Sequence, residues 1–261
     1  MPEQFRIYEF RTPDNGGSNF KDKVVEYLPK IGFILIALLF IASFTDLLSN
    51  PIKLLITYPI FILSLVLHEL SHAYMADFLG DPTPRLTGRL TLNPLKHLDV
   101  VGTLLFLFCG FGWAKPVQVD ASNFRKPDRA MVSVALAGPL CNFILALLGA
   151  LVFRITLEST QNIKYLYNIG FVCFQLTSIN VLLAVFNLIP IPPLDGSRLV
   201  HYLLPAPYKA KYYLYAKQYA FIIMILVFMY AGKMISPVVN DILYYLGFDK
   251  FIMIFRQYHH I

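Results

Sequence analysis

Long apolar stretches dominate this chain and leave few folds open to it. A transmembrane helix needs about twenty predominantly apolar residues. With 57% hydrophobic and only 15% charged residues, the chain is too apolar for a soluble globular protein. We therefore expect an all-α polytopic membrane protein with about five to six transmembrane helices. The candidate spans are residues 31–48, 52–79, 130–157, 170–189 and 219–235.

A further apolar stretch, residues 100–111, is too short to cross a bilayer as a helix. Glycines surround it at Gly102, Gly110 and Gly112. We interpret it as a re-entrant or interfacial segment.

The basic residues predict how the chain is oriented. Residues 1–30, 85–129 and 198–217 hold most of the Lys and Arg, whereas the opposite connections hold only Lys53, Arg154 and Lys164. By the positive-inside rule, the three basic segments are cytoplasmic. The net charge of +6 therefore indicates topology in a cell membrane and not nucleic-acid binding. No cleavable signal peptide is expected, because residues 1–30 lack an apolar core.

Three regions follow from this pattern. Residues 1–30 form a cytoplasmic N-terminal extension, residues 31–235 a membrane-embedded domain with a core at about 52–204, and residues 236–261 an amphipathic or membrane-surface segment. The three cysteines, Cys109, Cys141 and Cys173, are widely spaced in apolar surroundings, so we expect them to be packing residues.

The motif His68-Glu69-Leu70-Ser71-His72 follows fourteen uncharged residues, Leu54 to Leu67. An ionisable residue deep in lipid costs roughly 2.5–3.5 kcal/mol even on lenient scales, so such a residue is a functional candidate. In a helix the two histidines lie at i and i+4, and both imidazoles can reach one metal ion. Glu69 would then lie beside a water molecule on that ion. A pair of interfacial histidines at a helix end is the alternative.

Asp195 is the best candidate for a third metal ligand. Hydrolytic zinc sites usually take three protein ligands, and a carboxylate can be one of them. Two spans that cross the membrane and return bring Asp195 to the depth and side of the histidines. Pro190, Pro192 and Pro193 break the helix before it, and Gly196 allows a turn. A polar aspartate at a helix end is the alternative.

Two asparagines are candidates for supporting the site. Asn142 lies in the third span, and its amide either faces the metal and substrate or hydrogen-bonds between helices. Asn187 lies one turn before Pro190 and could satisfy carbonyls that the proline frees. We expect His97 and His201 to make local hydrogen bonds.

Residues 86–92 alternate apolar and polar side chains, which predicts a strand. With residues 113–120 it would form a small membrane-associated β-hairpin or sheet. Its edge would either pair with an extended substrate or only plug the site.

Four motifs together resemble the site-2 protease family of intramembrane zinc metalloproteases, peptidase family M50. They are His68-Glu-Leu-Ser-His72, Asn93-Pro-Leu-Lys-His97-Leu-Asp, Ala137-Gly-Pro-Leu-Cys-Asn142 and Asn187-Leu-Ile-Pro-Ile-Pro-Pro-Leu-Asp195-Gly196, in the family's order between about Leu54 and Leu204. The resemblance implies one Zn²⁺ per chain, held by His68, His72 and Asp195, with Glu69 as catalytic base.

The resemblance also implies a reaction and a partner. The reaction is hydrolysis of peptide bonds within or near transmembrane segments, as in regulated intramembrane proteolysis, and the substrate is a single-span membrane protein in the lipid bilayer. No region is long and polar enough for the PDZ or CBS domains of some family members. The sequence selects neither a particular substrate nor an oligomeric state.

Two other functions would use the same residues. A zinc transporter should line a path across the bilayer with polar groups at several depths, whereas here they gather at one end of two spans. An inactive, protease-like adaptor has no need of the complete motif set.

Overall fold

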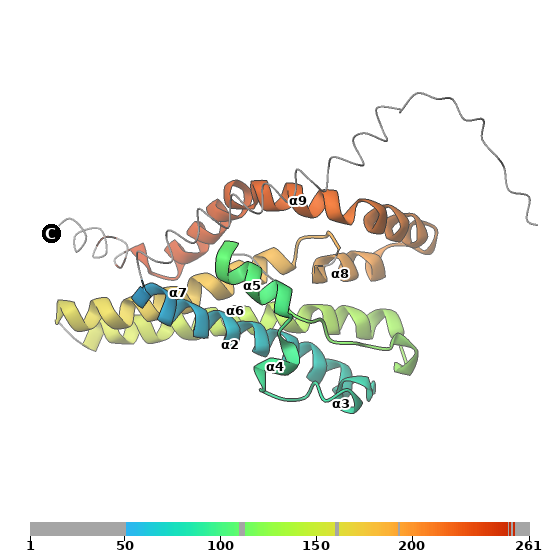
Figure 1. The fold of residues 1–261 in the computed structure, drawn as a ribbon, viewed down its shortest axis with the longest axis horizontal. Coiled ribbons are helices and arrows are strands. Elements are labelled where there is room, and N and C mark those ends of the chain that lie inside the picture. The colour runs from blue at the N-terminus through green and yellow to red at the C-terminus, as the bar shows by residue number, and fades with distance from the viewer. Residues whose placement is uncertain are drawn as a thin grey trace, which may run out of the picture.

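The computed structural model describes residues 51–109, 113–159, 162–192, 194–249, 251 and 253. In this described part the chain is helical and forms no strand (Figure 1). The helices are α2 (Pro51–Phe78), α3 (Thr83–Leu86), α4 (Pro94–His97), α5 (Val100–Cys109), the 3₁₀ helix η1 (Ala121–Asn123), α6 (Pro127–Ser159), α7 (Ile163–Asn187), α8 (Asp195–Leu203) and α9 (Ala206–Tyr245).

Three long helices form the centre of the molecule. In Figure 1, α2, α6 and α7 lie side by side, and α6 contacts both of the others as well as α8. Three segments of the described residues are long and apolar enough to cross a membrane: Leu55–Phe78, Pro127–Ser159 and Tyr165–Asn187. Helix α6 also exposes a row of apolar side chains, Leu140, Leu147, Leu151 and Ile155. Such a face suits contact with lipid.

These three segments match three of the five predicted spans. The predicted span at residues 31–48 lies outside the described residues, and so does the N-terminal extension before it. The predicted span at residues 219–235 is helical and forms part of α9. The total of five to six spans and the re-entrant path of residues 100–111 therefore stay predictions, although residues 100–109 do form the short helix α5.

Two apolar clusters stabilise opposite ends of α6. The first contains Phe153, whose ring stacks on Phe248 with centroids 4.6 Å apart, together with Phe251 and the buried Cys173. It joins the end of α9 and the residues after it to α6 and α7. The second cluster consists of Ala76, Phe124, Ala130, Met131 and Val134, and it joins the end of α2 to the start of α6.

The predicted β-hairpin is not formed in the described residues. Leu86 ends α3, and the chain turns at Gly88 with a φ of 66°, so residues 86–92 do not extend as a strand. Residues 113–120 instead meet the chain after α4, through an isolated antiparallel bridge between Leu98 and Ala114. The alternation of apolar and polar residues was too short to predict the structure here, because the segment begins at the end of a helix and then turns.

Asp81 fastens this loop region to the end of α2. Its buried carboxylate accepts hydrogen bonds from the amide and hydroxyl of Thr83, the amide of Asp120 and the side-chain amide of Asn123. Burial opposes ionisation, but these hydrogen bonds prevail and hold the pKa of Asp81 below its ordinary value. The carboxylate thereby fixes residues 120–123 against the end of the helix that carries the histidines.

Candidate metal centre

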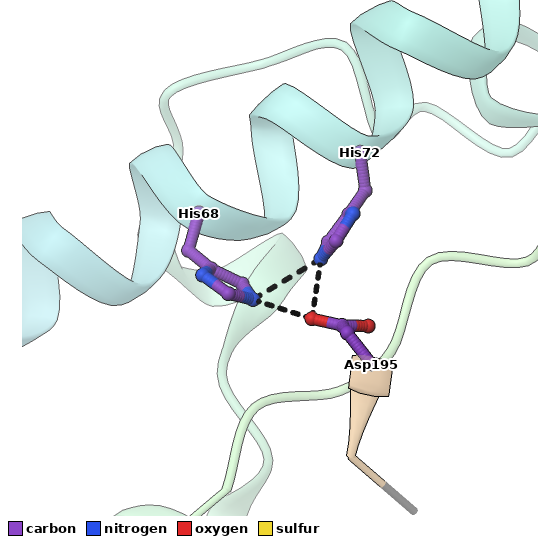
Figure 2. A group of neighbouring side chains, drawn as sticks. All are labelled: His68, His72 and Asp195. Atoms are coloured by element: carbon purple, nitrogen blue, oxygen red, sulfur yellow. Dashed lines mark hydrogen bonds and ion pairs between the residues drawn. The ribbon is translucent and has the colours of Figure 1, made fainter. Parts of the chain in front are cut away.

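Helix α2 places His68 and His72 one turn apart, so both rings leave the same face. Figure 2 shows them converging on the carboxylate of Asp195. The two Nε2 atoms are 3.1 Å apart, and Oδ2 of Asp195 lies 3.1 Å from that of His68 and 3.0 Å from that of His72. All three residues are buried. The structure thus brings the three ligands expected from the sequence into one cluster.

Asp195 reaches the histidines because the chain changes direction between α7 and α8. Helix α7 ends at Asn187, and regular helix resumes only at Asp195. Gly196 permits the close approach of the two helix ends, since a Cβ atom there would lie 2.2 Å from the carbonyl oxygen of Leu188. No side chain fits at that distance, so this position requires glycine.

The other nitrogen of each ring faces an acceptor. Nδ1 of His72 lies 2.7 Å from the carbonyl oxygen of Val134, and Nδ1 of His68 bonds to Oδ1 of Asn142. An oxygen acceptor requires a proton on Nδ1, which leaves the Nε2 lone pairs directed into the cluster. Metal-bound histidines are usually oriented in this way.

The cluster fits a zinc ion. Zinc with nitrogen and oxygen ligands at roughly 2.0–2.1 Å in a tetrahedron has its ligand atoms roughly 3.3–3.4 Å apart, close to the separations here. Gly138 of α6 leaves space over the cluster: a Cβ atom there would lie 2.4 Å from Nε2 of His72 and 2.6 Å from Nε2 of His68. Three converging lone-pair atoms beside such a space form a cation site.

Glu69 does not join the three ligands. Its buried carboxylate accepts a hydrogen bond through Oε2 from the amide of Val117, 3.1 Å away. This is the hydrogen bond that the described residues give to the Glu69 carboxylate, and it leaves Oε1 available. The carboxylate of Glu69 is therefore fixed in place next in sequence to His68, with one oxygen available. A proton acceptor needs such an arrangement.

Arg89 holds the segment that provides this amide. Its buried guanidinium donates to the carbonyl oxygens of Lys96 at 2.6 Å, Lys115 at 3.2 Å and Pro116 at 3.3 Å. The last two precede Val117 directly. The guanidinium therefore sets the path of the backbone just before the amide that contacts the glutamate.

The two predicted asparagines have different surroundings. Asn142 bonds to His68 of α2 and also to Asn180 of α7, so its contacts include those of both interpretations. The amide of Asn187 donates to the carbonyl of Leu183 one turn earlier in its own helix. His97 is fully buried and bonds through Nε2 to the carbonyl oxygen of Thr91. Neither Asn187 nor His97 contacts the ligand cluster.

Several residues at the site were not expected from the sequence. Asn180 and Ser64 are fully buried and continue the hydrogen bonds of Asn142. Gly138 lies within one of the four motifs without a role of its own, and Arg89 lies in a basic segment that was interpreted as topogenic. A polar residue inside an apolar span is a usable signal for Asn180. The sequence holds no comparable signal for Gly138 or Arg89.

Comparison with known proteins gives an independent result. The family model described as Peptidase family M50 matches residues 166–231. The chain is 44% identical over 172 residues to "Putative zinc metalloprotease YwhC" of Bacillus subtilis, which covers 64% of this chain and 77% of that protein. It is 30% identical over 174 residues to "Putative zinc metalloprotease Rip2" of Mycobacterium tuberculosis, covering 64% of each. No solved structure matches the chain.

A more distant relative, "Zinc metalloprotease MJ0392" of Methanocaldococcus jannaschii, is 25% identical over 178 residues, and the chain spans 42% of its length. The match to YwhC extends over more than three quarters of that protein. The family expected from the motifs is confirmed, and this chain belongs to peptidase family M50.

Proposed function

We propose that this protein is a zinc endopeptidase that cleaves single-span membrane proteins within or near their transmembrane segments, as in regulated intramembrane proteolysis. The observation that carries the proposal is the buried triangle of His68, His72 and Asp195, with Glu69 on the same helix. Relatives named as zinc metalloproteases support zinc as the ion. The single cluster of this kind among the described residues suits one ion per chain.

The position of the triangle along α2 supports cleavage inside the membrane. His68 lies ten residues before Phe78, where the apolar span ends. At 1.5 Å per residue His68 lies about 15 Å from this end, and His72, six residues before Phe78, lies about 9 Å from it. Both depths fall within a hydrocarbon core of about 30 Å, on the side of this end. The basic segments lie beyond this end of the span, so the positive-inside rule assigns it to the cytoplasmic side of the cell membrane.

The residues divide the chemistry between them. Bound zinc would supply Lewis acidity to the scissile carbonyl and to a water molecule. His68, His72 and Asp195 would hold the ion. The free oxygen of Glu69 would take the proton of the attacking water and return it to the leaving amine. The hydrogen bond from Val117 keeps this carboxylate in place.

Replacement of Glu69 tests the proposal. We expect Glu69→Gln to abolish cleavage, since an amide cannot accept the proton, and to leave the zinc content unchanged. The measurement compares membrane proteins of cells that express the wild-type or the variant, and a transmembrane fragment should accumulate only with the variant. Zinc per purified protein is measured in parallel.

Glu158→Gln is the matched control, because Glu158 is exposed and pairs with Arg154 far from the triangle. It should behave as the wild-type. Unchanged cleavage in Glu69→Gln would rule out the proposed role of Glu69. If reconstituted vesicles accumulated zinc with either protein, a transporter would explain the site better.

A further inference from the structure

The two histidines obtain their orientation in different ways. Nδ1 of His72 faces a backbone carbonyl, that of Val134, which can only accept a hydrogen bond. Nδ1 of His68 faces the side-chain amide of Asn142. An amide can present either its oxygen or its NH₂ group. His68 therefore directs its Nε2 lone pair to the metal only if Asn142 keeps its oxygen toward the ring.

A second asparagine determines which way the first one points. Nδ2 of Asn142 donates to Oδ1 of Asn180, 2.7 Å away, and over a longer distance of 3.5 Å to the backbone carbonyl oxygen of Ser64. Nδ2 of Asn180 in turn donates to the carbonyl oxygen of Leu176 and to Oγ of Ser64, both at 2.8 Å. The hydroxyl of Ser64 donates to the carbonyl of Ile60, so its oxygen is left as an acceptor for Asn180.

The donors and acceptors of these hydrogen bonds cannot be exchanged. The carbonyl of Leu176 cannot donate, so the NH₂ group of Asn180 must face it and the oxygen of Asn180 must face Asn142. Asn142 then has its NH₂ group toward Asn180 and its oxygen toward His68. The order is fixed from a backbone carbonyl of α7 to a ring nitrogen of α2.

Burial makes this order costly to reverse. Ser64, Asn142 and Asn180 each have no exposed surface and lie between α2, α6 and α7. A reversed amide of Asn142 would set its oxygen against the oxygen of Asn180 and its NH₂ group against Nδ1 of His68, at positions with no exposure to bulk solvent.

We propose that Asn180, assisted by Ser64, is a positioning residue for the metal site: it orients the amide of Asn142 so that Nε2 of His68 remains available to the ion. This rests on the proposed zinc function. It differs from simple helix packing by Asn180, because the effect passes through the orientation of one amide.

Zinc affinity of the purified, detergent-solubilised protein tests the proposal, measured by competition with a chelating dye. Loss of an outer-shell partner typically weakens metal binding by 10–100-fold. We expect Asn180→Leu to weaken zinc binding by about tenfold, at the low end of this range. Asn180→Ala gives the same test with a smaller side chain if leucine prevents folding.

Thr177→Val is the matched control. Thr177 is fully buried on α7, one turn before Asn180, and its hydroxyl donates to the carbonyl of Ala146 in α6. It shares the helix pair and the burial but has no bond to the network. Its zinc affinity should equal that of the wild-type.

A rescue variant separates orientation from packing. A carboxylate accepts through either oxygen, so Asn142→Asp has no orientation for Asn180 to set. In the double variant Asn142→Asp with Asn180→Leu, zinc affinity should return to about the wild-type value. A packing role for Asn180 predicts no recovery.

The outcomes are distinct. Wild-type affinity in Asn180→Leu, or a double variant as weak as Asn180→Leu, would overturn the positioning role while the zinc site stands. A wild-type protein that binds no zinc, or a His72→Ala variant that binds as tightly as the wild-type, would overturn the proposed function itself.

Discussion

At the scale of single residues, the site depends as much on an absent side chain as on the ligands. Gly138 lies on α6, opposite the two histidines of α2. The helices approach so closely there that even a methyl group would collide with both Nε2 atoms. The three ligand residues alone are therefore not sufficient for a metal site, because residue 138 must also be glycine.

Gly138→Ala should abolish zinc binding with the ligands intact. Its Cβ atom would lie 2.4–2.6 Å from both Nε2 atoms, well inside contact distance. Zinc per purified protein is the measurement.

Gly170→Ala is a control of similar steric severity, because its Cβ atom would lie 2.7 Å from the ring of Phe251 at the other end of the bundle. It should lower stability but keep zinc. A zinc-replete Gly138→Ala protein would contradict the assigned position of the ion.

The sequence predicts part of this site for clear physical reasons. Helical periodicity places His68 and His72 on one face, and the out-and-back topology brings Asp195 to them. The contacts of Gly138 and Asn180 depend on how α6 and α7 are rotated about their own axes. Helices in lipid are apolar on nearly every side, so the pattern of apolar residues does not specify that rotation.

At the scale of elements, the irregular segment 113–117 matters more than a regular strand would. Its backbone is held by the guanidinium of Arg89 and by a hydrogen bond from the amide of Lys115 to the carbonyl of His97. The sequence predicted a hairpin with residues 86–92, because apolar and polar residues alternate there. The hydrogen bonds of a buried arginine to carbonyl oxygens of distant residues cannot be inferred from the sequence.

Arg89→Met should impair cleavage and spare zinc binding. Without the guanidinium, the amide of Val117 no longer holds Glu69, and misplacement of a catalytic group by about 1 Å costs on the order of a hundredfold in rate. We expect kcat/KM to fall roughly tenfold to a hundredfold. Arg85→Met, where the exposed arginine pairs with Asp77 at the surface, should leave kcat/KM unchanged. Loss of zinc in Arg89→Met would instead indicate a general folding role.

The anchor at Asp81 should make the loop region sensitive to acid. The folded-state pKa of Asp81 lies below the unfolded value of about 3.9, so its carboxylate stabilises the fold above about pH 4, and this is lost as pH falls through the folded pKa. Asp81→Asn should lower stability at pH 7 by about 2 kcal/mol. The difference from the wild-type should shrink below about pH 4, as followed by thermal unfolding. A difference independent of pH would exclude the ionised carboxylate as the cause.

At the scale of the whole molecule, the three proposed metal ligands come from two elements far apart in the chain, His68 and His72 from α2 and Asp195 from α8. A ligand that binds only the folded state stabilises it by about 2.7 kcal/mol at a free concentration of 100 times Kd. Excess chelator should therefore lower the thermal unfolding temperature of the wild-type protein. His72→Ala should unfold at the lower temperature and not respond to chelator. Identical wild-type curves with and without chelator would argue against a bound ion.

The separation of the ligands along the chain also determines when the enzyme becomes competent during its synthesis. His68 and Asp195 are 127 residues apart. At roughly 5–20 residues per second, a ribosome needs about 6–25 s to make the residues between them. A nascent chain that has already inserted α2 thus carries two histidines and a glutamate but no complete site. On the proposed assignment, the chain therefore has only two of its three metal ligands until α6 and α7 have been made.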